Sequence, residues 1–345
     1  MIVKMFATSG SEKIASDICK SLALRLPSHL QPDQGLALSQ HKVSRFHNDE
    51  ILVQVDNVRG KYGVIIHTEV PPVNDHLIEL KALIDAIVNA HPKDLLLVFP
   101  YYPYGRADRK NKPRVSTMGQ VLAEEITNQG VKRVMILDPH AQHIKHFFKP
   151  TADDITSMYL FISYLRREFF PTYPMEECIL VFADAGSAKR YEDFAGLAGL
   201  RPAFIYKYRP DSNGDAEVSD VIGDVRNKIA ILIDDEILTG NTAIKDAEVL
   251  VNAGAGRVVM IATHGVLNHT EIGPAGVIKR LVDSPIDQFI ITDSIPLPQL
   301  ALTSPKFKVI SVAHLIAEAI KRTVEDDSLT ALRSVDCVEM LCGRY

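Results

Sequence analysis

The sequence predicts an α/β protein made of two domains, each with a mostly parallel central sheet flanked by helices. Short runs rich in valine, isoleucine and leucine recur along the chain, and longer segments with helical periodicity separate them. Such runs are typical of parallel strands that are buried on both faces. A chain of 345 residues is long enough for two ordinary domains.

Six apolar runs are predicted as strands, and each ends at a polar or turn residue. They are Leu95–Phe99, Val134–Leu137, Ile179–Ala183, Ile229–Ile233, Val258–Ala262 and Phe289–Thr292. The predicted helices are His76–Asn89, Thr117–Gln129, Ser157–Phe169 and Thr242–Ala253. Gly130 and Gly254 follow two of these helices, at the position where glycine commonly ends a helix.

The polar residues at the strand ends come from both halves of the chain, so we expect the two domains to share or face one cleft. The predicted divisions are an N-terminal domain over 1–152, a C-terminal domain over 153–325 and a polar, acidic tail over 326–345. These divisions follow from composition and from the spacing of the predicted elements.

Composition excludes several classes of protein. A net charge of -5 gives no general attraction to nucleic acid, so any phosphate site must be local. No apolar run approaches the roughly 20 residues that a membrane span needs. The N-terminus lacks the features of a signal peptide, and the 4 cysteines show no pairing motif. We therefore expect a cytoplasmic protein with free thiols.

The most informative segment runs from Ile231 to Thr242. An aliphatic run ends in Asp234 and Asp235, and a turn with hydroxyl and glycine residues then leads into a predicted helix. Backbone N–H groups at a helix start bind phosphate, and ligands of parallel sheets lie beyond the carboxyl ends of strands. The two acids suit either ribose hydroxyls or Mg²⁺. The segment predicts a sugar-phosphate site.

A second candidate segment runs from Pro100 to Lys110, directly after a predicted strand. It combines tyrosines with Arg106, Arg109 and Lys110. These side chains suit stacking of a purine and neutralisation of a triphosphate. They equally suit a solvated basic loop, and the chemistry alone leaves both interpretations open.

Histidines and strand-end acids give further candidates. His140, His143 and His146 invite a zinc interpretation, but on a helix the first and third would lie on nearly opposite sides. His143 and His146 are better explained as surface residues, and His140 is the stronger functional candidate. Asp184 follows a strand and suits either a metal ion or a helix N-cap.

Lys207 and Arg209 close another extended segment and would share one face of it. The polar stretch that follows indicates a loop that could close over a phosphoryl group. A solvated strand end is the simpler interpretation of these two residues considered alone.

Taken in order, these segments resemble the ribose-phosphate diphosphokinase (phosphoribosyl pyrophosphate synthetase) family over Phe6 to Ser334. The resemblance implies two tandem phosphoribosyltransferase-like domains, an N-terminal one on the ATP side and a C-terminal one on the ribose 5-phosphate side. It implies Mg²⁺ as cofactor, with His140 and Asp184 near the metal. It also implies that Lys207 and Arg209 are catalytic, and that the chain forms a homo-oligomer based on dimers, up to a hexamer.

The resemblance further implies two sets of substrate-binding residues. The ATP-binding set is Phe46, Asn48, Asp49, Glu50, Arg106, Ala107 and Asp108. The ribose 5-phosphate-binding set is Arg209, Asp234, Asp235, Leu238, Thr239, Gly240, Asn241 and Thr242.

Three residues depart from the family pattern. Ala107 stands where glutamine is usual, Leu238 where an acid is usual, and Asn241 where glycine is usual. Asparagine tolerates positive φ better than most residues, so we expect Asn241 to preserve the turn.

The reaction implied is transfer of the diphosphoryl group of ATP to O1 of ribose 5-phosphate, which gives phosphoribosyl pyrophosphate and AMP. The departures leave open a catalytically silent regulatory paralogue. A phosphoribosyltransferase is the other alternative, because it would share the loop over 234–242 without needing the ATP segments.

Overall fold

The computed structural model describes residues 2–208 and 218–342, which form two compact units. Unit 1 comprises Met1–Ser157, Ser294–Pro296 and Val312–Tyr345, and unit 2 comprises Met158–Asp293 and Leu297–Ser311. Among the described residues, no helix has the length and apolar character needed to cross a membrane.

Unit 1 contains a five-stranded sheet with the order β1-β4-β5-β6-β7, in which all neighbours are parallel. Its strands are β1 Val3–Ala7, β4 Tyr62–Thr68, β5 Asp94–Tyr101, β6 Arg133–Leu137 and β7 Asp153–Ile155. The antiparallel hairpin of β2 His41–Arg45 and β3 Ile51–Val55 forms a separate two-stranded sheet. The helices include α1 Glu12–Ala23, α2 Val73–Asn89, α3 Met118–Asn128, α10 Ala313–Val324 and α11 Val335–Cys342.

Unit 2 contains a seven-stranded sheet with the order β10-β9-β8-β11-β12-β13-β14, parallel except where β10 pairs with β9. Its strands are β8 Cys178–Phe182, β9 Arg201–Tyr208, β10 Val218–Ile222, β11 Ile229–Ile237, β12 Arg257–Gly265, β13 Gln288–Thr292 and β14 Phe307–Ile310. The helices are α4 Met158–Tyr164, α5 Ala185–Arg190, α6 Phe194–Ala198, α7 Asn241–Asn252, α8 Gly273–Val282 and α9 Gln299–Thr303.

The predicted α/β class with mostly parallel sheets is confirmed, and the six predicted strands are β5, β6, β8, β11, β12 and β13. Their apolar runs are buried because helices cover the sheets, and each unit has a core of its own. Gly130 and Gly254 have φ of 96° and 94°, so both take the left-handed conformation expected after α3 and α7. The helix predicted over Ser157–Phe169 is α-helical over Met158–Tyr164, and a π-helical turn over Leu165–Phe169 follows it directly.

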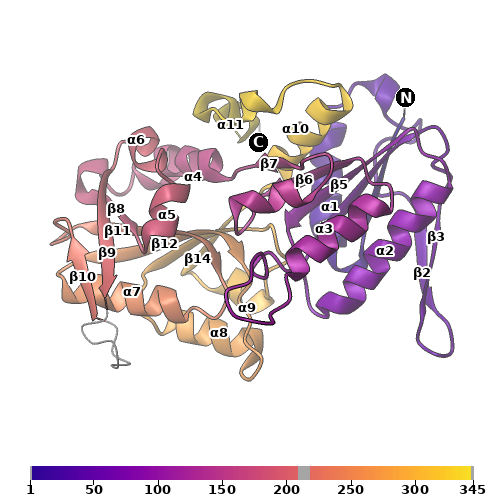
Figure 1. The fold of residues 1–345 in the computed structure, drawn as a ribbon. Helices are drawn as coiled ribbons and strands as arrows, with labels where there is room; N and C mark the ends of the chain where they lie inside the picture. Colours follow the sequence, from indigo (N-terminus) through magenta and orange to yellow (C-terminus); the bar gives the residue numbers. More distant parts are fainter. Residues whose placement is uncertain (1, 209–217, 343–345) are drawn as a thin grey trace. The chain divides into compact units, whose positions relative to one another are not determined.

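The C-terminal segment packs on the N-terminal part of the chain. Helix α10 lies against α1, where Ser21 Oγ and His314 Nδ1 are 2.7 Å apart (Figure 1). Beyond α10, Arg333 reaches the Asp154 carboxylate at 3.1 Å. The sequence predicts 312–325 in the second domain and 326–345 as a tail, whereas the described residues 312–342 belong to the compact unit built around β1. The apolar face of α10 explains this, because Ile316 and Ile320 are fully buried in unit 1.

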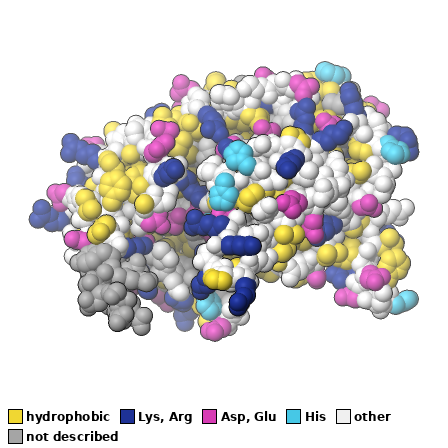
Figure 2. Space-filling model, in the orientation of Figure 1, with side chains coloured by type: hydrophobic (Ala, Val, Ile, Leu, Met, Phe, Trp, Pro, Cys, Tyr) yellow, Lys and Arg dark blue, Asp and Glu magenta, His cyan; other side chains and the backbone are white. Residues whose placement is uncertain are grey.

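Charged side chains of both signs are interspersed over the face shown in Figure 2. A mixed surface agrees with the modest net charge of -5 and with the expectation that any anion site is local.

Candidate functional site

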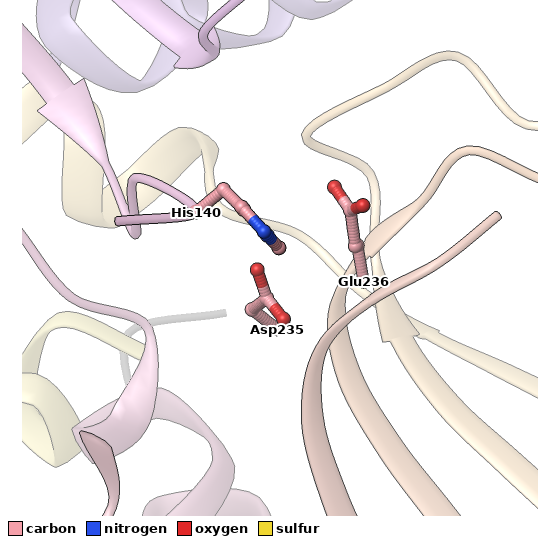
Figure 3. A group of neighbouring side chains, drawn as sticks. All are labelled: His140, Asp235 and Glu236. Atoms are coloured by element: carbon pink, nitrogen blue, oxygen red, sulfur yellow. The ribbon is translucent and has the colours of Figure 1, made fainter. Parts of the chain in front are cut away.

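The carboxyl end of β11 carries three consecutive acids in unit 2. The aliphatic residues Ile229–Ile233 are buried between β8 and β12, and Asp234, Asp235 and Glu236 follow them. Figure 3 shows Asp235 and Glu236 at this end of the strand, and it also shows His140 in the loop that follows β6 of unit 1. The acids lie where ligands of parallel sheets bind.

The electrostatics of this strand end favour a cation or a hydroxyl-rich ligand. Partial burial, together with the negative charges of Asp235 and Asp184, raises the pKa of Asp234 to about 8. Asp235 is buried and pairs with the Arg190 guanidinium at 3.5 Å, so one of the two acids has a cationic partner. Tyr191 donates its hydroxyl to the backbone oxygen of Asp234 at 3.1 Å. Helix α5 thereby holds the end of β11 in place.

The turn after β11 presents the first residues of α7. Gly240 is the N-cap with φ 76°, and a Cβ added to it would lie 2.6 Å from Leu281 Cδ2. Both facts require glycine at this position. The expectation that Asn241 supplies the positive φ is wrong, because Asn241 is the first helical residue and Gly240 takes that conformation. The Asn241 side-chain oxygen instead accepts a hydrogen bond from Arg280.

The remaining residues of this turn shape its backbone. The Thr239 hydroxyl oxygen accepts a hydrogen bond from the Asn241 amide at 3.4 Å, and Leu238 offers its carbonyl oxygen to the Asn268 amide at 3.0 Å. Thr242 is exposed in the first turn of α7. Leu238 therefore serves the backbone of the turn, and the N–H groups at the start of α7 are those suited to an anion.

Asp184 is the N-cap of α5. Its Oδ1 accepts a hydrogen bond from the Ser187 amide at 2.7 Å, and the Ser187 hydroxyl completes a capping box. The sequence allowed either an N-cap or a metal ligand here, and the cap is present. Because Asp184 is exposed and influences the pKa of Asp234, its charge acts on the same strand end.

Lys207 lies near the end of β9, the strand that pairs with β10. Its ammonium nitrogen is 2.8 Å from Oδ1 and 3.1 Å from Oδ2 of Asp246, which is on α7. Arg209, predicted alongside Lys207, lies outside the described residues. Lys207 is thus attached to the helix that begins at the predicted phosphate turn.

The first predicted ATP segment forms the tip of the β2–β3 hairpin. Asn48 and Glu50 are exposed, and the Phe46 side chain is 54% exposed. Asp49 has φ 71°, donates its amide to the Phe46 oxygen at 2.9 Å, and pairs with Arg45 at 2.9 Å. These contacts shape a tight tip that holds an aromatic ring out to solvent.

The second predicted ATP segment is packed against the segment that carries His140. A Cβ added to Gly105 would lie 3.5 Å from His140 Cβ, so the backbone beside Arg106 approaches His140 closely. Asp108 pairs with His143 Nε2 at 3.2 Å, while the backbone oxygen of Ala107 accepts from the Gly119 amide at 3.1 Å. Unit 1 therefore brings Arg106–Asp108 and His140 together. His143 is half exposed, as expected of a surface residue.

Two residues that the sequence did not single out contact the predicted site. Asp246 binds Lys207, and Arg190 binds Asp235. Asp246 had a detectable signal, because it lies on the same helical stripe as the buried residues Ala243, Ala247 and Leu250. A charged residue on a buried stripe requires a partner.

Comparisons with known proteins cover nearly the whole chain. The family model described as the N-terminal domain of ribose phosphate pyrophosphokinase matches residues 3–130, and the phosphoribosyl synthetase-associated domain matches residues 202–333. The ribose-phosphate pyrophosphokinase of Aquifex aeolicus is 36% identical over 325 residues, which are 94% of this chain and 99% of that protein. The enzyme of the same name from Thermotoga maritima is 36% identical over 96% of this chain and 98% of its own length.

One solved structure extends the comparison to the fold. The phosphoribosylpyrophosphate synthetase of Mycobacterium smegmatis superposes with a TM-score of 0.82 at 28% sequence identity. The match covers 94% of this chain and 100% of that one.

Proposed function

The chain belongs to the ribose-phosphate pyrophosphokinase family, and we propose that it transfers the diphosphoryl group of ATP to O1 of ribose 5-phosphate. The products are phosphoribosyl pyrophosphate and AMP. The observation that carries the proposal is the end of β11, where an acid pair precedes a glycine-capped helix start. As part of the same proposal, the enzyme acts in the cytoplasm as a homo-oligomer.

The turn and the acid pair have separate tasks in binding ribose 5-phosphate. The backbone N–H groups at the start of α7, with Thr239 and Thr242, bind the 5-phosphate. Asp234 and Asp235 accept hydrogen bonds from ribose hydroxyls and thereby orient O1. Gly240 keeps the turn tight, since Leu281 occupies the space that a side chain would need.

The residues of unit 1 bind the nucleotide. The exposed Phe46 ring stacks on the adenine, with Asn48, Asp49 and Glu50 beside it. Arg106 neutralises phosphate oxygens, and Ala107 and Asp108 shape the loop around it. Ala107 offers the base no side-chain amide.

Carboxylate oxygens suit Mg²⁺, and burial together with the charges of Asp235 and Asp184 raises the pKa of Asp234, a shift that a bound cation would oppose. Asp184 and His140 would hold the ion. When bound, Mg²⁺ offsets charge on the phosphate oxygens.

In the transfer step, O1 forms a bond to the β-phosphorus of ATP as the bond from that phosphorus to the α-phosphate oxygen breaks. The bridging oxygen leaves with AMP, and the O1 proton passes to solvent. Phosphoryl transfer depends mainly on positioning and charge stabilisation. Lys207 and Arg209 supply positive charge to the transferring group.

The direct test measures AMP and phosphoribosyl pyrophosphate together, from ATP, Mg²⁺ and ribose 5-phosphate, with and without inorganic phosphate. We expect both products in equal amounts. ATP binding without turnover would instead support the silent regulatory paralogue. A chain that binds phosphoribosyl pyrophosphate but no ATP would support the phosphoribosyltransferase.

A substitution at Asp184 can separate its role as the N-cap of α5 from its proposed role in binding Mg²⁺. Asparagine is as good an N-cap as aspartate, so Asp184→Asn keeps the cap of α5 while it removes the charge. We expect a free energy of unfolding within about 0.5 kcal/mol of wild type and a several-fold higher Mg²⁺ requirement in the product assay. Asp184→Ala should lose a further ~1 kcal/mol of stability. An unchanged Mg²⁺ requirement in Asp184→Asn would mean that Asp184 only caps α5 and does not bind the ion.

A further inference from the structure

Asp246 lies in the second turn of helix α7, on the stripe of that helix that is buried in the core of unit 2. Its side chain is 3% exposed, and both carboxylate oxygens contact the Lys207 ammonium, at 2.8 Å and 3.1 Å. Lys207 itself is 23% exposed, so solvent still reaches part of the cation. The pair therefore joins a nearly buried carboxylate to a partly exposed ammonium group.

A buried carboxylate is costly unless a cation and hydrogen bonds compensate its charge. The Lys207 ammonium supplies such compensation through its contacts with both carboxylate oxygens of Asp246. The same ammonium is expected to contact the transferring phosphoryl group, which is also anionic. The carboxylate and the nucleotide phosphates therefore compete for one cation.

We propose that Asp246 is a positioning residue that holds Lys207 in a docked state before ATP binds, so that nucleotide phosphates must displace the Asp246 carboxylate. The identity of the competing anion rests on the proposed function. The docking of Lys207 on Asp246 is independent of that function. When the competent state is only a fraction of the population, the apparent dissociation constant rises in inverse proportion to that fraction. Docking thus sets the concentration of ATP at which Lys207 engages.

The docked state is tested first by the rate at which an acylating reagent modifies Lys207 in the ligand-free protein, followed by peptide mass spectrometry. Lys245, an exposed residue of the same helix, is the internal reference. We expect Lys207 to react several-fold more slowly than Lys245, and to accelerate in Asp246→Asn while Lys245 does not change. Equal rates for the two lysines in wild type would overturn the docking, and this comparison needs no variant to fold.

The competition is tested by steady-state kinetics of Asp246→Asn. We expect the apparent KM for ATP to fall about five- to tenfold, with the change confined to KM, as release of a docked population predicts. The matched control is Glu248→Gln, which removes the same charge from an exposed position of α7 and should leave both constants unchanged.

Failure of the competition and failure of the proposed function give different results. A fall in kcat without a fall in KM would show that Asp246 supports the transition state, and it would overturn the competition. Absence of turnover in wild type would contradict the proposed function, while the acylation rates would still decide the docking.

Discussion

Replacing Lys207 with alanine is expected to lower turnover by a factor of about 10³ to 10⁵, the range for cationic groups that stabilise phosphoryl transfer. Binding of ribose 5-phosphate should change less, because Lys207 contacts α7 at Asp246, beyond the turn that is proposed to bind the 5-phosphate. The measurement is kcat from AMP release, with ribose 5-phosphate affinity from equilibrium binding. Near-normal turnover would remove Lys207 from the mechanism.

The ion pair with Asp246 adds a second expected effect of the same substitution. Asp246 is 3% exposed, so Lys207→Ala leaves a buried carboxylate without the ammonium that contacts it. We expect the free energy of unfolding to fall by about 1–3 kcal/mol. The double variant Lys207→Ala/Asp246→Asn should regain that stability but not the turnover, whereas Lys245→Ala on the same helix should change neither. Recovery of both stability and turnover in the double variant would mean that Lys207→Ala lost activity because it unfolded.

The strands could be predicted because burial on both faces makes their sequences almost purely aliphatic. The runs at 95–99, 134–137 and 229–233 carry that signal with little interruption. The short edge strand β7 lacks it, since Asp153 and Asp154 occupy two of its three positions. The place of α10 could not be predicted, because amphipathic periodicity marks a buried face without identifying what covers it.

The candidate site could be located from sequence, but the contacts among its residues could not. Acids that follow aliphatic runs indicated strand ends, and the structure has Asp184 and Asp234 at such ends in unit 2. Pairing between Lys207 and Asp246 joins residues far apart in the chain, and a single sequence gives no information on such pairs. The positive φ was assigned to the wrong residue, because both Gly240 and Asn241 tolerate it and only the tertiary contact with Leu281 decides.

Replacing Asp234 with asparagine is expected to make the ligand-free protein more stable and the enzyme less active. Partial burial, with the charges of Asp235 and Asp184, raises the pKa of Asp234 from 3.8 to about 8. Between these two pH values the folded protein retains a proton that the unfolded chain has lost. Stability therefore falls as pH rises from about 4 to about 8, because the native state binds more protons than the unfolded state.

Asparagine resembles the protonated acid and does not ionise, so the stability of Asp234→Asn does not fall in this way as pH rises. We expect Asp234→Asn to exceed wild type by about 2–4 kcal/mol in the free energy of unfolding at pH 8, with the difference vanishing near pH 4. Denaturant titrations of both proteins at several pH values without Mg²⁺ provide the measurement. A constant difference across this pH range would mean that Asp234 does not titrate as inferred.

Activity should change in the opposite direction. Loss of one charged hydrogen bond to a ribose hydroxyl lowers kcat/KM for ribose 5-phosphate about 10- to 100-fold. The adjacent Asp235→Asn is the matched control for stability, because Asp235 already pairs with Arg190 at 3.5 Å and its neutralisation removes that attraction. We expect no gain in stability from Asp235→Asn. A stability gain paired with an activity loss at Asp234 alone would identify it as an acid that is retained for ligand binding at a cost in the stability of the ligand-free protein.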